Sequence, residues 1–152
     1  MIKKVELRNF KCFERLELPL SNLNLLSGIN SMGKSTLIQI LLLLRQSYEQ
    51  NTLEKGIYLN GKYTNLGVGK DILYTDAKEN KISIFLEGEQ SFLRAEYDYH
   101  GASDFLKLMS QVSVDATKSL NLFDKEFQYI GADRLGPQSS YEKSYYGVWE
   151  NR

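Results

Sequence analysis

Nine consecutive residues near the start of the chain have the types and spacing that bind phosphate. They follow the pattern G-x-x-x-x-G-K-[ST] and read Gly28, Ile29, Asn30, Ser31, Met32, Gly33, Lys34, Ser35 and Thr36. Glycines in such a loop let the backbone curl so that successive N–H groups point at phosphate oxygens. The lysine can reach the β and γ phosphates, and the serine hydroxyl can ligate a bridging Mg²⁺. The pattern therefore predicts binding of a nucleoside triphosphate together with Mg²⁺.

The segments on either side of this loop have the order that the motif requires. Residues 23–27 form a short apolar run that predicts a buried strand, and residues 36–50 contain neither Gly nor Pro and predict a helix. The positive end of that helix favours the same negative charge as the loop. Leucines occupy all of positions 41–44, so we expect the helix to be covered on more than one face. Its apolar run is shorter than the roughly 20 residues that cross a bilayer, so no membrane association is expected.

Composition sets further limits on fold and partners. With 152 residues, 42% of them hydrophobic and 25% charged, the chain can form one domain with a core. Basic and acidic residues balance at 19 each, which argues against a broad basic face for nucleic acid but leaves a local patch open. Cys12 is the single cysteine, so it excludes a disulfide framework and is expected to be a small, buried or half-buried side chain. His100 is expected in a turn after a strand. The first residues lack a secretory signal, which makes the cytoplasm the expected compartment.

Alternating apolar residues and turn signals predict an α/β fold in which antiparallel hairpins surround the loop helix. Three hairpins are expected, pairing 2–10 with 13–18, 57–59 with 62–64 around Asn60-Gly61, and 82–86 with 92–97. A short helix is expected over 102–109. A last strand is expected over 127–132, followed by a loop at 133–138.

Three motifs together resemble the head domain of ABC-type ATPases of the SMC and RecF group. The first is Asn9-Phe10-Lys11-Cys12-Phe13 between two strands, the second is the phosphate-binding loop with its Asn30, and the third is Tyr129-Ile130-Gly131-Ala132-Asp133-Arg134-Leu135-Gly136-Pro137. Within that group the chain looks most like the bacterial AAA-family ATPases related to the overcoming-lysogenisation-defect (OLD) proteins. The resemblance covers nearly all 152 residues.

The resemblance implies that residues 1–152 are the N-terminal portion of one incomplete ATPase head. In such heads ATP lies between two protomers, and hydrolysis needs a signature motif and a strand ending in Asp-Glu, neither of which is present in this sequence. The implied partners are the C-terminal remainder of the head, a second copy of the full-length protein, and DNA or an effector nuclease. ATP hydrolysis is implied for the full-length protein, in DNA transactions or phage defence, and the chain alone is expected to be inactive. Lys11 resembles the basic residue that approaches the nucleotide in this group, with a solvated turn lysine as the equal alternative. By position in the family, Gln138 is implied to sense the Mg²⁺ that Ser35 would ligate.

Two acidic residues are weighed as substitutes for the missing catalytic carboxylate. Glu87 ends a strand whose alternation suits a half-buried hairpin, and Asp133 follows an apolar run but also suits a turn or a pair with Arg134. The catalytic residue is therefore left unassigned. Two other classes stay open beside the ATP-binding lobe: a kinase or small GTPase-like enzyme with the same loop, and a catalytically silent interaction module.

Overall fold

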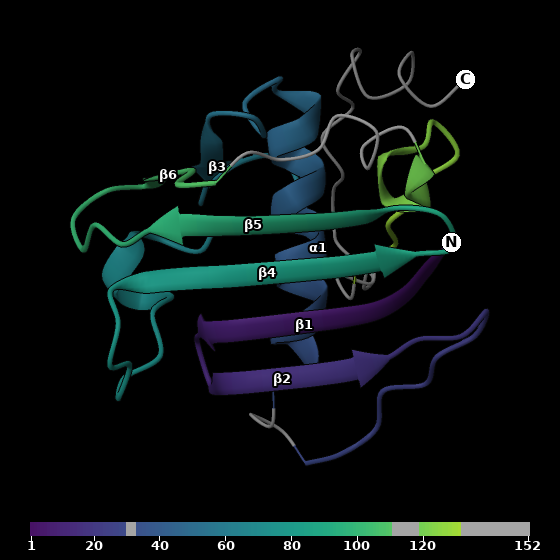
Figure 1. The fold of residues 1–152 in the computed structure, drawn as a ribbon, viewed down its shortest axis with the longest axis horizontal. Coiled ribbons are helices and arrows are strands. Elements are labelled where there is room, and N and C mark those ends of the chain that lie inside the picture. Colours follow the sequence, from purple (N-terminus) through teal and green to yellow (C-terminus); the bar gives the residue numbers. More distant parts are fainter. Residues whose placement is uncertain (30–32, 111–118, 132–152) are drawn as a thin grey trace, which may run out of the picture.

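A four-stranded antiparallel sheet and one long helix form the framework of the chain (Figure 1). The computed structural model describes residues 1–29, 33–110 and 119–131. The strands are β1 (Ile2–Phe10), β2 (Phe13–Pro19), β4 (Lys81–Gly88) and β5 (Phe92–Asp98), in the spatial order β2-β1-β4-β5. Helix α1 (Lys34–Glu49) runs across these strands, behind them in the view of Figure 1.

One face of the sheet and the helix share a single hydrophobic core. Apolar residues alternate with polar ones along each strand, so the apolar side chains gather on one face of the sheet. The buried ones are Val5, Leu7, Phe10, Ile82, Ile84, Leu86, Leu93, Ala95 and Tyr97. On α1 they meet Ile40, Leu43 and Leu44, each with no exposed surface. Leu42, Arg45 and Gln46, on other sides of α1, are buried as well, so the prediction that the helix is covered on more than one face is confirmed.

A second, two-stranded sheet covers the far part of the helix. Strand β3 (Gly56–Tyr58) pairs with β6 (Phe105–Lys107) in antiparallel register. Two short 3₁₀ helices, η1 (Gly69–Asp71) and η2 (Asn121–Phe123), complete the regular elements of the described residues. The β1–β2 and β4–β5 hairpins and the helix after the loop are confirmed.

The expected strand over residues 23–27 is wrong for the described chain. All residues from 21 to 29 are exposed, and Leu25 retains 90% of its surface. No described strand lies beside this segment, and the side chains of Ser21 and Asn24 hydrogen-bond to local backbone groups instead. An apolar run becomes a buried strand only where a neighbouring strand satisfies its backbone.

Two other predictions fail because a distant segment competes for the backbone. The helix expected at 102–109 is wrong, because this segment contains strand β6, in which Leu106 is fully buried opposite Ile57. A helix of eight residues has little stability of its own, so pairing with β3 prevails. The expected turn at Asn60-Gly61 is wrong, because the chain reverses one step later: Gly61 N–H donates to the Thr64 carbonyl at 3.0 Å, and Asn60 pairs with Asn65. Residues 62–64 are not a strand, because the side chain of α1 residue Gln46 accepts hydrogen bonds from two of their amides.

The last expected strand, over 127–132, is also wrong for the residues that the structure describes. Residues 127–131 have no strand structure, and Tyr129 and Ile130 are exposed. The ring of Phe127 packs instead beneath the guanidinium of Arg45, 4.9 Å from its centroid. Residue 132 and the expected loop at 133–138 lie outside the described residues.

Candidate functional site

The first turn of α1 begins at a left-handed glycine without the usual cap. Gly33 has φ +85° and ψ 5°, and its carbonyl accepts the N–H of Leu37 at 3.2 Å. No side chain caps this turn and no acidic residue lies within it. A helix N-terminus normally satisfies its free N–H groups with an Asp, Asn, Ser or Thr cap. Among the described residues, the positive end of the helix therefore has neither a capping side chain nor an acidic residue in its first turn.

Lys34 folds back over the start of the loop. Its Nζ donates to the carbonyl oxygens of Gly28 and Ile29, each at 2.7 Å. An ammonium group has three N–H donors and no acceptor, so two donors tie the loop together and one remains. The lysine therefore holds its positive charge at the helix N-terminus, between the two ends of the glycine loop.

The turn between β1 and β2 packs directly on this start of α1. A Cβ placed on Gly33 would overlap the ring of Phe13 and would lie 2.8 Å from Cys12 Sγ. Only glycine fits here, for both the left-handed backbone and the space. The close approach fixes the position of the helix N-terminus relative to the sheet.

Lys11, at the tip of the same turn, points along α1. Its Nζ donates to Gln39 Oε1 at 2.9 Å, and its N–H donates to the Ile72 carbonyl at 2.7 Å. Burial lowers the pKa of Lys11, while Cys12 and Asp71 act in the opposite direction. Lys11 also has a left-handed backbone, with φ +50°, which a lysine rarely adopts. The structure thus holds a second, partly desolvated ammonium within one to two turns of Lys34 along the helix.

Cys12 is exposed, which corrects the expectation that it is buried or half-buried. It lies at the tip of the β1–β2 turn, where the chain faces the start of α1 instead of the core. Its Sγ lies 3.9 Å from the hydroxyl oxygen of Thr36. Thr36 itself is buried, whereas Ser35 is exposed and its hydroxyl is accessible to a ligand.

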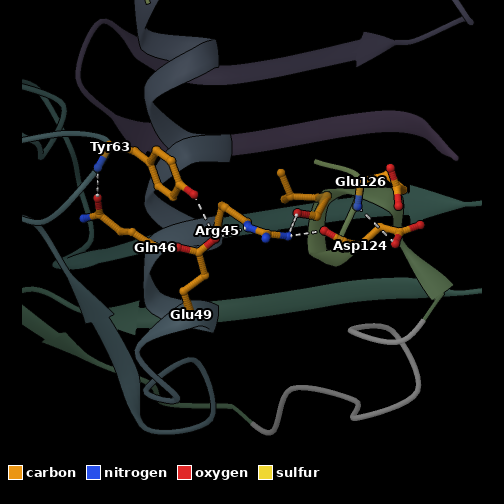
Figure 2. A network of polar contacts seen from close by, with 7 residues as sticks. Arg45, Gln46, Glu49, Tyr63, Asp124 and Glu126 are labelled. Atoms are coloured by element: carbon orange, nitrogen blue, oxygen red, sulfur yellow. Dashed lines mark hydrogen bonds and ion pairs between the residues drawn. The ribbon is translucent and has the colours of Figure 1, made fainter. Parts of the chain in front are cut away.

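A buried polar network anchors the other end of α1 (Figure 2). Arg45 retains 8% of its surface and donates to the carbonyls of Leu122 at 3.0 Å and Asp124 at 2.6 Å, and to Glu49 at 2.7 Å. Tyr63 also donates to Glu49, at 2.8 Å. Burial acts to raise the pKa of Glu49, but the bonds from Tyr63 and Arg45 outweigh it and hold the pKa below its usual range.

Gln46, next to Arg45, is a second anchor with 1% of its surface exposed. Its side chain donates to the Tyr58 carbonyl at 2.9 Å and accepts the amides of Tyr63 and Thr64. Buried polar groups with partners rigidify a structure, because each partner lost leaves a group unpaired. Both ends of α1 are therefore held, so the helix presents Lys34 and Ser35 at a defined place.

The structure brings only some of the predicted site residues together. Gly28, Gly33, Lys34, Ser35 and Thr36 adjoin one another, with Lys11 beside them. The positions that lie outside the described residues are Asn30, Ser31, Met32, Asp133 and Gln138.

Glu87 is not part of this group. It is exposed, and in the strand register it lies opposite Lys4, near the start of β1. The turn that touches Gly33 follows the other end of β1. The distance along the strand from Lys4 to Phe10, six residues further on, is about 20 Å. His100 is exposed and lies after β5, before the turn at Gly101, as expected.

Two contact residues were not predicted from the sequence. Gln39 receives the hydrogen bond of Lys11, and Phe13 packs on Gly33. Gln39 lies four residues after Ser35, on the same helix face, so helical spacing from the motif could have identified it. No sequence signal pairs Phe13 with a glycine twenty residues later, because that contact depends on how the hairpin packs.

One of the comparisons with known proteins identifies a family. A family model described as AAA ATPase domain matches residues 1–151. No curated protein and no solved structure matches the chain. Among the described residues, no helix has both the length and the apolar character needed to cross a membrane.

Proposed function

The chain belongs to the AAA ATPase domain family, and we propose that it binds the phosphates of Mg²⁺-ATP at residues 28–36. Family membership supports nucleotide binding in general. The observation that carries the specific proposal is the ammonium of Lys34, held between the carbonyls of Gly28 and Ile29 at an uncapped helix N-terminus. Positive charge, a free N–H donor and the helix dipole all favour an anion at this point.

Each residue of the proposed site has a separate role. Lys34 directs its remaining donor at the β and γ phosphates, while its other two donors keep the loop closed. The exposed hydroxyl of Ser35 is available as a Mg²⁺ ligand, with Gln138 as a proposed second one. When bound, Mg²⁺ supplies charge neutralisation of the phosphates. Gly33 keeps the start of α1 against the turn between β1 and β2, because a side chain at that position would overlap Phe13 and Cys12.

Lys11 is proposed as a second cation for the nucleotide. Its ammonium already bonds to Gln39 on the helix face that carries Ser35, so a small rotation would direct it at a ligand beside the loop. The left-handed backbone at Lys11 is consistent with this role, because strained residues cluster at ligand contacts.

The wider assignment follows the family resemblance. We propose that the chain is the nucleotide-binding lobe of an SMC-, RecF- or OLD-like ATPase of the cytoplasm, acting in DNA transactions or phage defence, as a homodimer when full-length. The exposed apolar side chains of Leu23, Leu25 and Ile29 support a further strand of the head docking beside this segment. Because Glu87 lies far from Lys34, we expect ATP turnover by the chain alone to stay at background.

Calorimetric titration with Mg²⁺-ATP tests the proposal. We expect weak binding by the wild-type chain, and a loss of roughly 10- to 150-fold for Lys34→Ala, because one charge-assisted contact is worth about 1.5–3 kcal/mol. The matched control is Lys55→Ala, which removes an exposed lysine away from the loop. Equal binding by the two variants, or no heat at millimolar nucleotide, would overturn the proposal.

A further inference from the structure

The face of the four-stranded sheet opposite α1, toward the viewer in Figure 1, carries arginine and aromatic side chains that the proposed site does not use. We call it the outer face. On this face Arg15 of β2 lies directly opposite Arg8 of β1 in the strand register. The same row continues with Ser83 on β4 and Glu96 on β5. Like charges directly opposite one another destabilise a sheet. A pair of facing arginines is therefore a cost to the fold that a bound anion would remove.

Most carboxylates of this face are paired with lysines, but Glu14, which lines a hollow beside Arg8 and Arg15, has no ion pair among the described residues. Glu6 bonds to Lys4 at 2.7 Å, and Glu79 and Glu96 lie 3.1 Å and 4.0 Å from Lys81. Arg15 has a single exposed partner, Glu17, at 3.3 Å.

Arg8 and Arg94 have no carboxylate within 4.0 Å among the described residues. Their guanidinium groups keep donors for a phosphate, which they can bind in a bidentate manner.

Aromatic rings lie beside these arginines. Phe85 and Phe92 have ring centroids 5.9 Å apart on the outer face, and 56% of Phe92 is exposed. The guanidinium of Arg94 lies over the Phe85 ring, 5.3 Å from its centroid. Unpaired bases stack on exposed aromatic rings and on arginine planes. The neighbouring strands β4 and β5 therefore provide aromatic rings for base stacking next to a guanidinium that can donate hydrogen bonds to phosphate.

Two hollows lie beside the arginines, and the first also borders the ring of Phe85. The first, of about 280 Å³, is lined by Arg8, Ser83, Phe85 and Arg94, and by the carboxylates of Glu6, Glu79 and Glu96. The second, of about 420 Å³, is lined by Arg8, Arg15 and Lys78, and by the carboxylates of Glu14 and Glu79. Both include Arg8 and Asn9, so they form a continuous track from β5 to β2. Three strand spacings make this track about 14 Å across.

We propose that this track binds single-stranded nucleic acid, with Phe85, Phe92 and Arg94 stacking on bases and Arg8 and Arg15 holding phosphates. A duplex keeps its bases stacked within itself and therefore cannot use the rings. The site lies on the side of the sheet away from α1, so it acts independently of nucleotide at Lys34.

Fluorescence anisotropy with a labelled oligothymidylate, an oligouridylate and a duplex of equal length tests the proposal. We expect both single strands to bind more tightly than the duplex at about 50 mM salt. The double variant Arg8→Gln, Arg15→Gln should flatten the slope of log affinity against log salt by about 1.4, at about 0.7 for each lost phosphate contact. Phe92→Ala should weaken binding roughly 5- to 150-fold, the equivalent of one stacked base.

Three controls separate this site from others. Lys55→Gln, Lys107→Gln removes two exposed lysines away from the outer face and should leave affinity and salt slope unchanged. Lys34→Ala should leave oligonucleotide binding unchanged, and Arg8→Gln, Arg15→Gln should leave ATP binding unchanged. Because the arginines repel each other, their removal should not unfold the chain.

Absence of oligothymidylate binding at about 50 mM salt would overturn the proposal. The proposal would also be overturned if the duplex bound as tightly as the single strands and Phe92→Ala did not change the affinity. Equal losses in the arginine variant and in the lysine control would also overturn it, since binding would then follow overall charge and not this surface.

Discussion

Replacing Gly33 with alanine tests how the hairpin and the helix are joined. Gly33 has a left-handed backbone, φ +85°, which costs an L-residue with a side chain about 1–2 kcal/mol. The added Cβ would also overlap the Phe13 ring and approach Cys12 Sγ to 2.8 Å, and overpacking of this kind costs about 1–3 kcal/mol. We therefore expect Gly33→Ala to lower the free energy of unfolding by about 2–5 kcal/mol.

Urea unfolding measured by circular dichroism gives this free energy directly. The transition midpoint should fall while the slope with denaturant stays unchanged. Gly28→Ala is the matched control, because Gly28 has φ +146° but no atom within 4 Å of an added Cβ. It should carry the backbone cost without the overlap, so its effect should be the smaller of the two.

A double-mutant cycle with Phe13→Ala isolates the steric part. Removing the ring makes room for the new methyl group, so the double variant should be more stable than the sum of the single effects by about 0.5–3 kcal/mol. Additive single effects, or a Gly33→Ala variant as stable as the wild type, would refute the close packing of the β1–β2 turn on the start of α1.

Three further predictions concern stability. Leu25→Asp should change the free energy of unfolding by no more than about 0.5 kcal/mol, because Leu25 is 90% exposed; a large loss in urea unfolding would show that residues 23–27 form a packed strand after all. Arg45→Met should cost about 3–5 kcal/mol in the same assay, because it leaves Glu49 and the carbonyls of Leu122 and Asp124 without their buried donor; a neutral substitution would contradict the network. Glu49→Gln should reduce the free energy of unfolding at neutral pH. A carboxylate with a lowered pKa stabilises the fold above its unfolded pKa and loses that effect as it becomes protonated. The difference in free energy between the variant and the wild type should therefore disappear as the pH falls below 4.5. A deficit that stays constant down to acidic pH would show that the charge of Glu49 is not involved.

Local patterns in the sequence were sufficient for the elements that bury their own side chains on a regular face. The alternation in β4 and β5 and the long apolar run of α1 each match one backbone period, so the hairpin and the helix follow from them. The phosphate-binding motif likewise locates Lys34 and Ser35 at the start of a helix, where the structure places them.

Long-range pairing could not be predicted in this way. Residues 102–109 lack a pattern of their own, and Leu106 becomes part of a strand only because β3 offers a partner. The amides of residues 63 and 64 bond to Gln46, a polar residue of α1 that is buried next to its apolar run. The contact of Phe13 with Gly33 and the facing pair Arg8 and Arg15 likewise arise from packing and strand register.

A series of ligands with increasing phosphate content tests the central claim most directly. In calorimetry with Mg²⁺ present, the affinity of the chain should rise from adenosine, which should not bind, through ADP to ATP, because the proposed site at residues 28–36 would contact phosphates and not the base. In Lys34→Ala the rise from ADP to ATP should be smaller. Adenosine binding as tightly as ATP, or the same rise in affinity without Lys34, would contradict phosphate recognition at residues 28–36.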